Sequence, residues 1–213
     1  MLADSATYEI QYGSVKRSSH DNTSWDHAKF ETCAHKYVDV SEYGYGVALL
    51  NDCKYGHDVR GGKIGLSLLK AGTYPNPEAD QGEHSFTYSL MPHEGDYREA
   101  GVVEQAYMLN NPLIAVKGDG KGDLPITYGA VSVNKGNIVI EVVKRSEDGK
   151  GIVVRAYESA GGQTSARISF GFDVNKVYEC DLMEDNRKLL PIIKNGVECI
   201  FAPFEIKTFY IQA

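Results

Sequence analysis

The segment from Asp39 to Gly62 holds the densest group of side chains that could do chemistry in this sequence. It combines three tyrosines, an amide, acids and basic groups with five glycines. The residues of interest are Tyr43, Tyr45, Asn51, Asp52, Lys54, Tyr55 and Arg60. A tyrosine ring can cover the C–H face of a sugar while polar groups bind its hydroxyls, so this mixture favours carbohydrate recognition. The alternative interpretation is a glycine-rich connection between strands, with the tyrosines as packing anchors.

No catalytic or metal-binding residue can be assigned from spacing. The six histidines lack zinc-motif spacing, and no G-x-S-x-G sequence offers an activated serine. Glycosidases need two carboxyl groups that face each other across a sugar. Glu31, Asp39, Glu42 and Asp52 are the acids available in the richest stretch. The spacing of these acids in the sequence does not give the distance between their carboxyl groups in the fold. We therefore assign no catalytic residue and no metal ligand in this chain.

The net charge and the cysteine content indicate which partners and which cellular compartment to expect. The 213 residues have a formal net charge of −7, and no run of Lys and Arg exceeds two residues. Nucleic acid and anionic membrane surfaces are therefore not expected as partners. No apolar run could span a bilayer, and the first residues lack the features of a secretory leader. The four cysteines show no C-x-x-C spacing, so we expect a cytoplasmic protein.

The elements that must position the segment are mainly strands. Short β-branched and aromatic runs alternate with Gly, Asn and Asp, which predicts an all-β, mainly antiparallel protein. In the first half we predict strands at Thr7–Tyr12, Lys29–Val38, Val47–Leu50, Lys63–Leu69 and His84–Met91. One short helix is expected near residues 96–110, because Asp96 and Glu99 have capping-box spacing and Asn110-Asn111-Pro112 ends the helical pattern.

A glycine-rich linker at residues 117–126 is followed by a second half in which strands and turns are shorter and more regularly spaced. Six or seven short strands follow, joined by turn sequences such as Asp148-Gly149-Lys150-Gly151. They begin with Val131–Val133 and Ile138–Val143 and end with Ile206–Ile211. The sequence therefore predicts one domain over residues 1–116 and a small β-sandwich over residues 127–213.

Several long strings in a fixed order resemble the C-terminal β region of glycoside hydrolase family 38 α-mannosidases, in their cytosolic and vacuolar branch. The resemblance covers nearly the whole chain. The strings are Tyr8–Gly13, Asn22–Asp26, Phe30–Lys36, Asp39–Gly56, Phe86–His93, Ala100–Pro112 and Ala202–Phe209.

The resemblance implies a part of a longer enzyme. Family members carry zinc and the catalytic carboxylates in an N-terminal domain, so it implies no catalytic residue, metal site or cofactor in this chain, and zinc in the rest of the enzyme. Residues 1–116 would be the later part of a mutarotase-like β super-sandwich, and residues 127–213 the small terminal β-sandwich. The full enzyme would release mannose from α-mannoside oligosaccharides with retention of configuration.

The same resemblance implies a role for this region beside the catalytic domain of the same protein. It would scaffold that domain and lend a loop to the sugar pocket, with candidate pocket-rim residues Asn51, Asp52, Lys54, Tyr55 and Arg60. An independent carbohydrate-binding module and a structural or oligomerisation domain are the alternatives. Because a super-sandwich that is cut part-way exposes strand edges, we also expect self-association.

Overall fold

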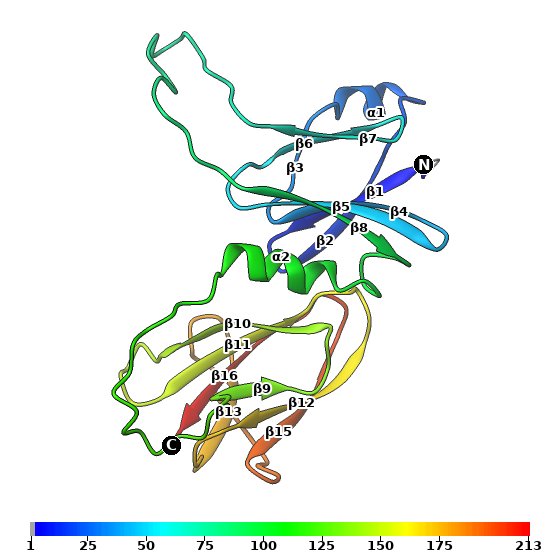
Figure 1. Cartoon of the computed structure of the whole chain (residues 1–213). Helices are drawn as coiled ribbons and strands as arrows, with labels where there is room; N and C mark the ends of the chain where they lie inside the picture. The colour runs from blue at the N-terminus through cyan, green and yellow to red at the C-terminus, as the bar shows by residue number, and fades with distance from the viewer. Residues whose placement is uncertain (1–2) are drawn as a thin grey trace. The chain divides into compact units, whose positions relative to one another are not determined.

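The computed structural model describes residues 3–213, which divide into two compact units on either side of the bond between Ile114 and Ala115. Figure 1 shows both units and labels most of their strands and helices. Sheets dominate each unit, and all strand pairs are antiparallel. The predicted all-β, mainly antiparallel class is thus confirmed, with two short helices.

The first unit consists of a five-stranded sheet, a three-stranded sheet and two helices. The larger sheet has the order β2-β1-β4-β5-β8, and the smaller one the order β3-β6-β7. The larger sheet comprises β1 (Ser5–Ile10), β2 (Gly13–Ser18), β4 (Tyr37–Glu42), β5 (Tyr45–Asn51) and β8 (Tyr88–Glu94). The smaller sheet comprises β3 (Thr32–Cys33), β6 (Gly56–Arg60) and β7 (Lys63–Ser67), and the helices are α1 (Ser24–Ala28) and α2 (Val102–Asn110).

The two faces of the larger sheet bury different cores, because successive side chains of a strand point to opposite faces. On one face, Tyr37 and Leu50 are in a cluster with Ala106 of α2. On the other face, Val38 and its neighbours are in a cluster with Val59 of β6. Figure 1 shows α2 and the β6–β7 hairpin on opposite sides of this sheet. The larger sheet is therefore covered on both faces.

Four of the five predicted strands of this unit extend beyond the observed ones: β1 ends at Ile10 and β7 at Ser67, and two strands differ more. The predicted strand Lys29–Val38 is interrupted: residues 29–31 are in a bend, β3 has two residues, and β4 begins only at Tyr37. The predicted strand His84–Met91 begins at Tyr88 and continues to Glu94. Backbone pairing explains both shifts, because a residue joins a sheet only where a neighbouring strand offers partners. The register of β8 against β5 begins at the pair Asn51 and Tyr88.

The predicted helix at residues 96–110 is shorter. Asp96 and Glu99 do exchange capping-box bonds: the backbone N–H of Asp96 donates to Glu99 and that of Glu99 donates to Asp96. These bonds close a separate turn, and α2 starts at Val102 after Gly101, whose φ is +67°. A left-handed residue interrupts a right-handed helix, so the helical pattern of Ala100 does not extend the helix. A second capping box, from Thr23 and Asp26, begins the unpredicted helix α1.

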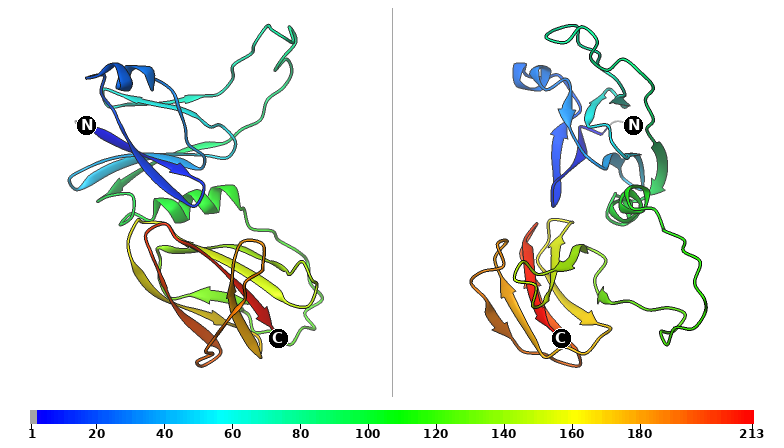
Figure 2. Two further views of the ribbon diagram at one scale, coloured as in Figure 1. Left: turned by 180° about the vertical axis from the view of Figure 1, so that it is seen from behind. Right: turned by 90° about the vertical axis from the view of Figure 1, so that its left-hand side faces the viewer.

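The second unit is a β-sandwich of two sheets, with strand orders β10-β11-β16-β13-β14 and β15-β12-β9. Its strands are β9 (Val131–Val133), β10 (Ile138–Arg145), β11 (Ile152–Glu158), β12 (Thr164–Phe170), β13 (Lys176–Cys180), β14 (Lys188–Leu190), β15 (Gly196–Phe201) and β16 (Ile206–Gln212). Val154 and Phe209 of one sheet share a buried cluster with Ile168 and Phe201 of the other. Figure 2 shows the two layers of this unit from behind and from the side. Every residue from 111 to 130 is exposed, with no helix or strand between Asn110 and Val131.

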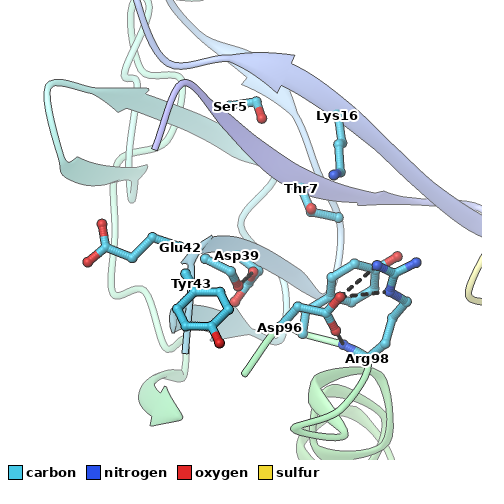
Figure 3. Close-up of a pocket in the computed structure, with 10 residues that line it drawn as sticks. Ser5, Thr7, Lys16, Asp39, Glu42, Tyr43, Asp96 and Arg98 are labelled. Atoms are coloured by element: carbon cyan, nitrogen blue, oxygen red, sulfur yellow. Dashed lines mark hydrogen bonds and ion pairs between the residues drawn. The ribbon is translucent and has the colours of Figure 1, made fainter. Parts of the chain in front are cut away.

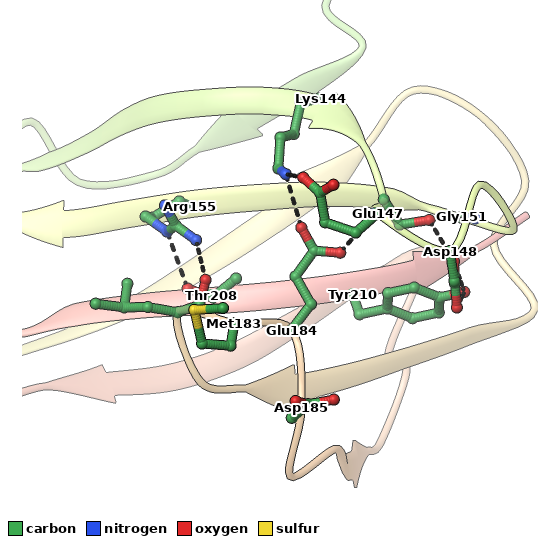
Figure 4. Close-up of polar contacts among 12 residues, drawn as sticks. Lys144, Glu147, Asp148, Gly151, Arg155, Met183, Glu184, Asp185, Thr208 and Tyr210 are labelled. Atoms are coloured by element: carbon green, nitrogen blue, oxygen red, sulfur yellow. Dashed lines mark hydrogen bonds and ion pairs between the residues drawn. The ribbon is translucent and has the colours of Figure 1, made fainter.

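Two loops of the second unit are tied to the sheet by carboxylates (Figure 4). Glu184, which is 3% exposed, accepts hydrogen bonds from Lys144 Nζ at 2.8 Å and from the backbone N–H of Glu147 at 2.8 Å. Asp148 accepts from the hydroxyl of Tyr210 at 3.1 Å. The backbone N–H of residue 150 and other donors hold the pKa of Asp148 well below its usual range. These bonds fix the loop of residues 146–151 against the strands.

Candidate functional site

Four of the five candidate pocket-rim residues lie at and after the end of β5. Asn51 is the last residue of β5, and Asp52, Lys54 and Tyr55 are in the loop of residues 52–55 that leads into β6. β6 begins at Gly56, where a Cβ would collide with Oε1 of Glu31 and lie 3.1 Å from the Cβ of Ser67. A side chain at this position would therefore displace the Glu31 carboxylate.

Asn51 lies beneath the loop and is 0% exposed. Its Nδ2 donates to the carbonyl of His35 at 2.8 Å, and its Oδ1 accepts from the backbone N–H of Lys54 at 2.6 Å. The Nε2 of His57 lies 3.4 Å from the same amide, and burial lowers the pKa of His57. The side chain of Asn110 donates to the Asn51 carbonyl at 3.0 Å. Asn51 thus holds the loop and is not available to a ligand in this conformation.

Asp52 fixes the loop to the segment before β8. Its Oδ1 accepts from the backbone N–H of Thr87 at 3.0 Å, and its own N–H donates to the Thr87 carbonyl at 3.1 Å. The first of these bonds is the largest cause that lowers the pKa of Asp52. Next to it, the ammonium of Lys54 lies 5.0 Å from the ring centroid of Phe86, a cation–π distance. The loop thereby carries an ionised carboxylate at position 52 and an ammonium at position 54, each held by the segment of residues 86–87.

Tyr55 is the exposed aromatic residue of the loop, with 51% of its surface accessible. Its ring stands edge-on to His35, with 5.1 Å between centroids and 85° between planes. Its carbonyl accepts from the backbone N–H of Ala34 at 3.1 Å. The ring position is therefore set by residues 34–35.

Arg60 lies at the far end of β6, away from the loop. Five residues of strand advance the chain by about 3.3 Å each, so Arg60 is roughly 13 Å further along β6 than Gly56. Its guanidinium donates to the carbonyls of His20 and Asp26, each at 2.7 Å, and also bonds to Asp21. The structure thus brings Asp52, Lys54 and Tyr55 together, places Asn51 below them and uses Arg60 to hold the α1 segment.

Sequence reasoning missed the residues that support this loop, His35, Phe86 and Thr87. No spacing pattern connects them to the loop, since they lie on separate segments. The only signal was their place in two strings that carry the family resemblance, Phe30–Lys36 and Phe86–His93.

The partly accessible carboxylate and ammonium and the exposed phenol can bind a polar, hydroxyl-bearing ligand, but they offer no paired acid and base for hydrolysis. Within residues 3–213, no group of three or more His, Cys, Asp or Glu side chains is arranged to hold a metal ion. The described residues therefore offer no set of zinc ligands, and no step through zinc is derived from them. In the same residues, no helix has the length and apolar character needed to cross a membrane.

Two family models match the chain. Residues 1–78 match the glycosyl hydrolases family 38 C-terminal domain, and residues 137–209 match the glycosyl hydrolases family 38 C-terminal beta sandwich domain. The chain is 44% identical to human alpha-mannosidase 2C1 over 207 residues, which is 94% of this chain and 20% of that protein. It is 40% identical to alpha-mannosidase G of Dictyostelium discoideum, with 97% of this chain and 20% of that protein covered.

The fold is similar to that of a solved structure, the crystal structure of an alpha-mannosidase from Enterococcus faecalis V583. The TM-score is 0.80 at 21% identity, and the match covers 100% of this chain and 24% of that one. The chain thus spans about a fifth of the length of the curated relatives it matches. The two domain matches, in the same order along the chain, show that it belongs to the C-terminal region of glycosyl hydrolases family 38.

Proposed function

We propose that this chain is the non-catalytic C-terminal β region of an α-mannosidase, a retaining, zinc-dependent enzyme whose catalytic groups and zinc lie in another part of the protein. The observation that carries the proposal is the 44% identity to human alpha-mannosidase 2C1 over 94% of this chain. The substrate class is α-mannoside oligosaccharides, and the nearest partner is the catalytic domain of the same protein.

The loop of residues 52–55 is the part that contacts the sugar pocket. Its support is the geometry, because Asn51 and Thr87 hold the backbone while Asp52, Lys54 and Tyr55 remain at least partly accessible. A loop with a fixed backbone lowers the entropic cost of positioning a substrate. The contribution to catalysis is positional: the loop orients the sugar and supplies no acid, base or metal.

The experiment compares Tyr55→Ala and Tyr74→Ala in the full-length enzyme that contains this sequence. Tyr74 is 91% exposed and lies outside the loop, so it controls for the loss of an exposed tyrosine. We expect Tyr55→Ala to raise KM for an aryl α-mannoside, with little effect of Tyr74→Ala. Equal kinetics for the two variants would contradict the role of the loop. Hydrolysis of the aryl mannoside by this chain alone would contradict its non-catalytic assignment.

A cytoplasmic location completes the proposal. Its support is the state of the cysteines, since Cys33, Cys53, Cys180 and Cys199 are all free thiols. Free thiols persist in a reducing compartment. Fractionation of cells that express the full-length protein with a tag tests it, and recovery in the secretory or vacuolar fraction would contradict it.

A further inference from the structure

A polar cleft in the first unit lies apart from the loop of residues 52–55 (Figure 3). Its volume is about 390 Å³, at the lower end of the range for small-molecule sites. Strands β1, β2 and β4, the β4–β5 turn and the segment before α2 contribute to it. The lining residues are Ser5, Thr7, Lys16, Asp39, Ser41, Glu42, Tyr43, Asp96, Tyr97 and Arg98.

The lining selects a class of ligand. Each of the ten residues carries a hydroxyl, a carboxylate or a basic group, and none is aliphatic. An apolar ligand would strip water from these groups without replacing the hydrogen bonds. Three carboxylates face two basic groups, which leaves one formal negative charge in excess and disfavours phosphates and other anions. The chemistry that remains is that of a neutral, hydroxyl-rich molecule.

The floor of the cleft is a buried carboxylate. Asp39 is 1% exposed, and its Oδ2 accepts from His93 Nε2 at 2.7 Å while its Oδ1 accepts from the hydroxyl of Ser41. Burial raises the pKa of Asp39, and these two hydrogen bonds act in the opposite direction. At 1% exposure the carboxylate is closed to a ligand, so it acts on the cleft through its position and charge beneath the surface.

This floor is not a serine-histidine-aspartate triad, because Ser41 bonds to the carboxylate and not to the imidazole. The imidazole reaches Asp39 by crossing β5 over Gly46, which is paired with Ser41 on one side and with His93 on the other. A Cβ at Gly46 would lie 2.2 Å from Cε1 of His93. The arrangement therefore requires the glycine.

The rim adds an aromatic face and an unpaired cation. Tyr43 forms the β4–β5 turn with Gly44 and is fully exposed. Lys16 makes no ion pair with any residue between 3 and 213, so its ammonium is available to a ligand. Arg98 is held by Asp96, with Nη2 at 2.6 Å from Oδ2. Figure 3 shows Asp39, Glu42 and Tyr43 on one side and the Asp96–Arg98 pair on the other.

The cleft and the loop are separate sites in this unit. They lie at opposite ends of β5, whose seven residues span roughly 20 Å at 3.3 Å per residue. We propose that the cleft binds a neutral saccharide unit, with the Tyr43 ring on its C–H face and the Lys16 ammonium on its hydroxyls. This site would add a sugar contact independent of the loop in the proposed function.

Calorimetric titration of the whole chain with α-1,2-mannobiose and with mannose 6-phosphate tests the proposal. We expect saturable binding of mannobiose and weaker binding of the phosphate. Tyr43→Ala should lower the affinity severalfold, because the sugar would lose the aromatic face at the rim of the cleft. Tyr74→Ala, an exposed tyrosine outside both sites, is the matched control that should leave the affinity unchanged. Lys16→Ala should weaken binding as well, and circular dichroism should show that each variant is folded.

The outcomes separate the two sites. No saturable heat with mannobiose overturns the cleft proposal, and so does unchanged affinity in Tyr43→Ala. A loss confined to Tyr55→Ala also overturns it, because the sugar contact then belongs to the loop of the proposed function. A loss in Tyr74→Ala equal to that in Tyr43→Ala overturns it as well. Tighter binding of mannose 6-phosphate contradicts the neutral ligand class.

Discussion

The buried carboxylate of Glu158 offers a quantitative test of the second unit. Glu158 ends β11 and is 0% exposed. Its Oε1 accepts from Asn137 Nδ2 and from the backbone N–H of Ala160, both at 2.9 Å. Its Oε2 accepts from three backbone N–H groups, those of residues 161, 162 and 204, at 2.8, 3.0 and 3.1 Å. One side chain thus joins the turn after β11, the β15–β16 connection and Asn137.

The change Glu158→Gln replaces one of the two oxygens by an NH₂ group. Whichever way the amide is oriented, at least two N–H donors lose their acceptor and face another donor. An unsatisfied buried donor costs about 1–3 kcal/mol, and these donors belong to partly exposed turns that water can reach, so the lower part of this range applies. We therefore expect the free energy of unfolding of the second unit to fall by about 2–3 kcal/mol.

The assay is urea unfolding followed by circular dichroism, with hydrogen–deuterium exchange of peptides from residues 131–213 to assign the loss to the second unit. Glu198→Gln is the matched control, because the Glu198 side chain is 62% exposed and its Arg167 partner lies 3.7 Å away. An exposed pair of this kind contributes at most about 1 kcal/mol. A loss in Glu158→Gln that is no larger than in Glu198→Gln would refute the reasoning.

Three further predictions concern other parts of the chain. Gly46→Ala should destabilise the first unit by about 1–3 kcal/mol, because the new Cβ overpacks against His93. Gly136→Ala is the control, since a Cβ there meets open space and should leave stability nearly unchanged. Equal effects of the two variants in thermal unfolding would contradict this. The pKa of Asp148 is lower in the folded state than in the unfolded state, where it is about 4. The stability that Asp148 contributes is therefore present above that unfolded pKa and is lost as the pH falls below it. Asp148→Asn should flatten the acid side of the pH–stability profile, and an unchanged profile would contradict this. The chain should self-associate through exposed sheet edges such as β8, where Leu90 is 65% exposed. Leu90→Lys should lower the average mass measured by analytical ultracentrifugation. A wild-type chain that is monomeric at all concentrations would exclude self-association.

The sequence predicted the second unit best, because its strands are dense in β-branched residues. The predicted runs Ile138–Val143 and Ile206–Ile211 lie inside β10 and β16. Such runs have few other ways to bury their side chains. In the first unit, the limits of β4 and β8 depend on where neighbouring strands offer partners, and those partners are distant in sequence.

For the candidate site, the sequence predicted which segment forms the loop but not the direction of its side chains. Asn51 and Asp52 are adjacent polar residues, yet one is enclosed by His35 and Asn110 and the other is partly accessible. The two enclosing residues come from two segments that are distant in sequence, so no local pattern contains this information. Arg60 is near the loop in sequence, but the extended strand β6 carries it to the α1 segment.

The crossing of His93 over Gly46 also constrains how this family can diverge. A larger residue at position 46 collides with the imidazole, while a smaller residue at position 93 leaves the Asp39 carboxylate with one donor fewer. A chain with only one of these replacements is therefore less stable than a chain with both or with neither. Positions 39, 46 and 93 should therefore co-vary among descendants, changing together or not at all.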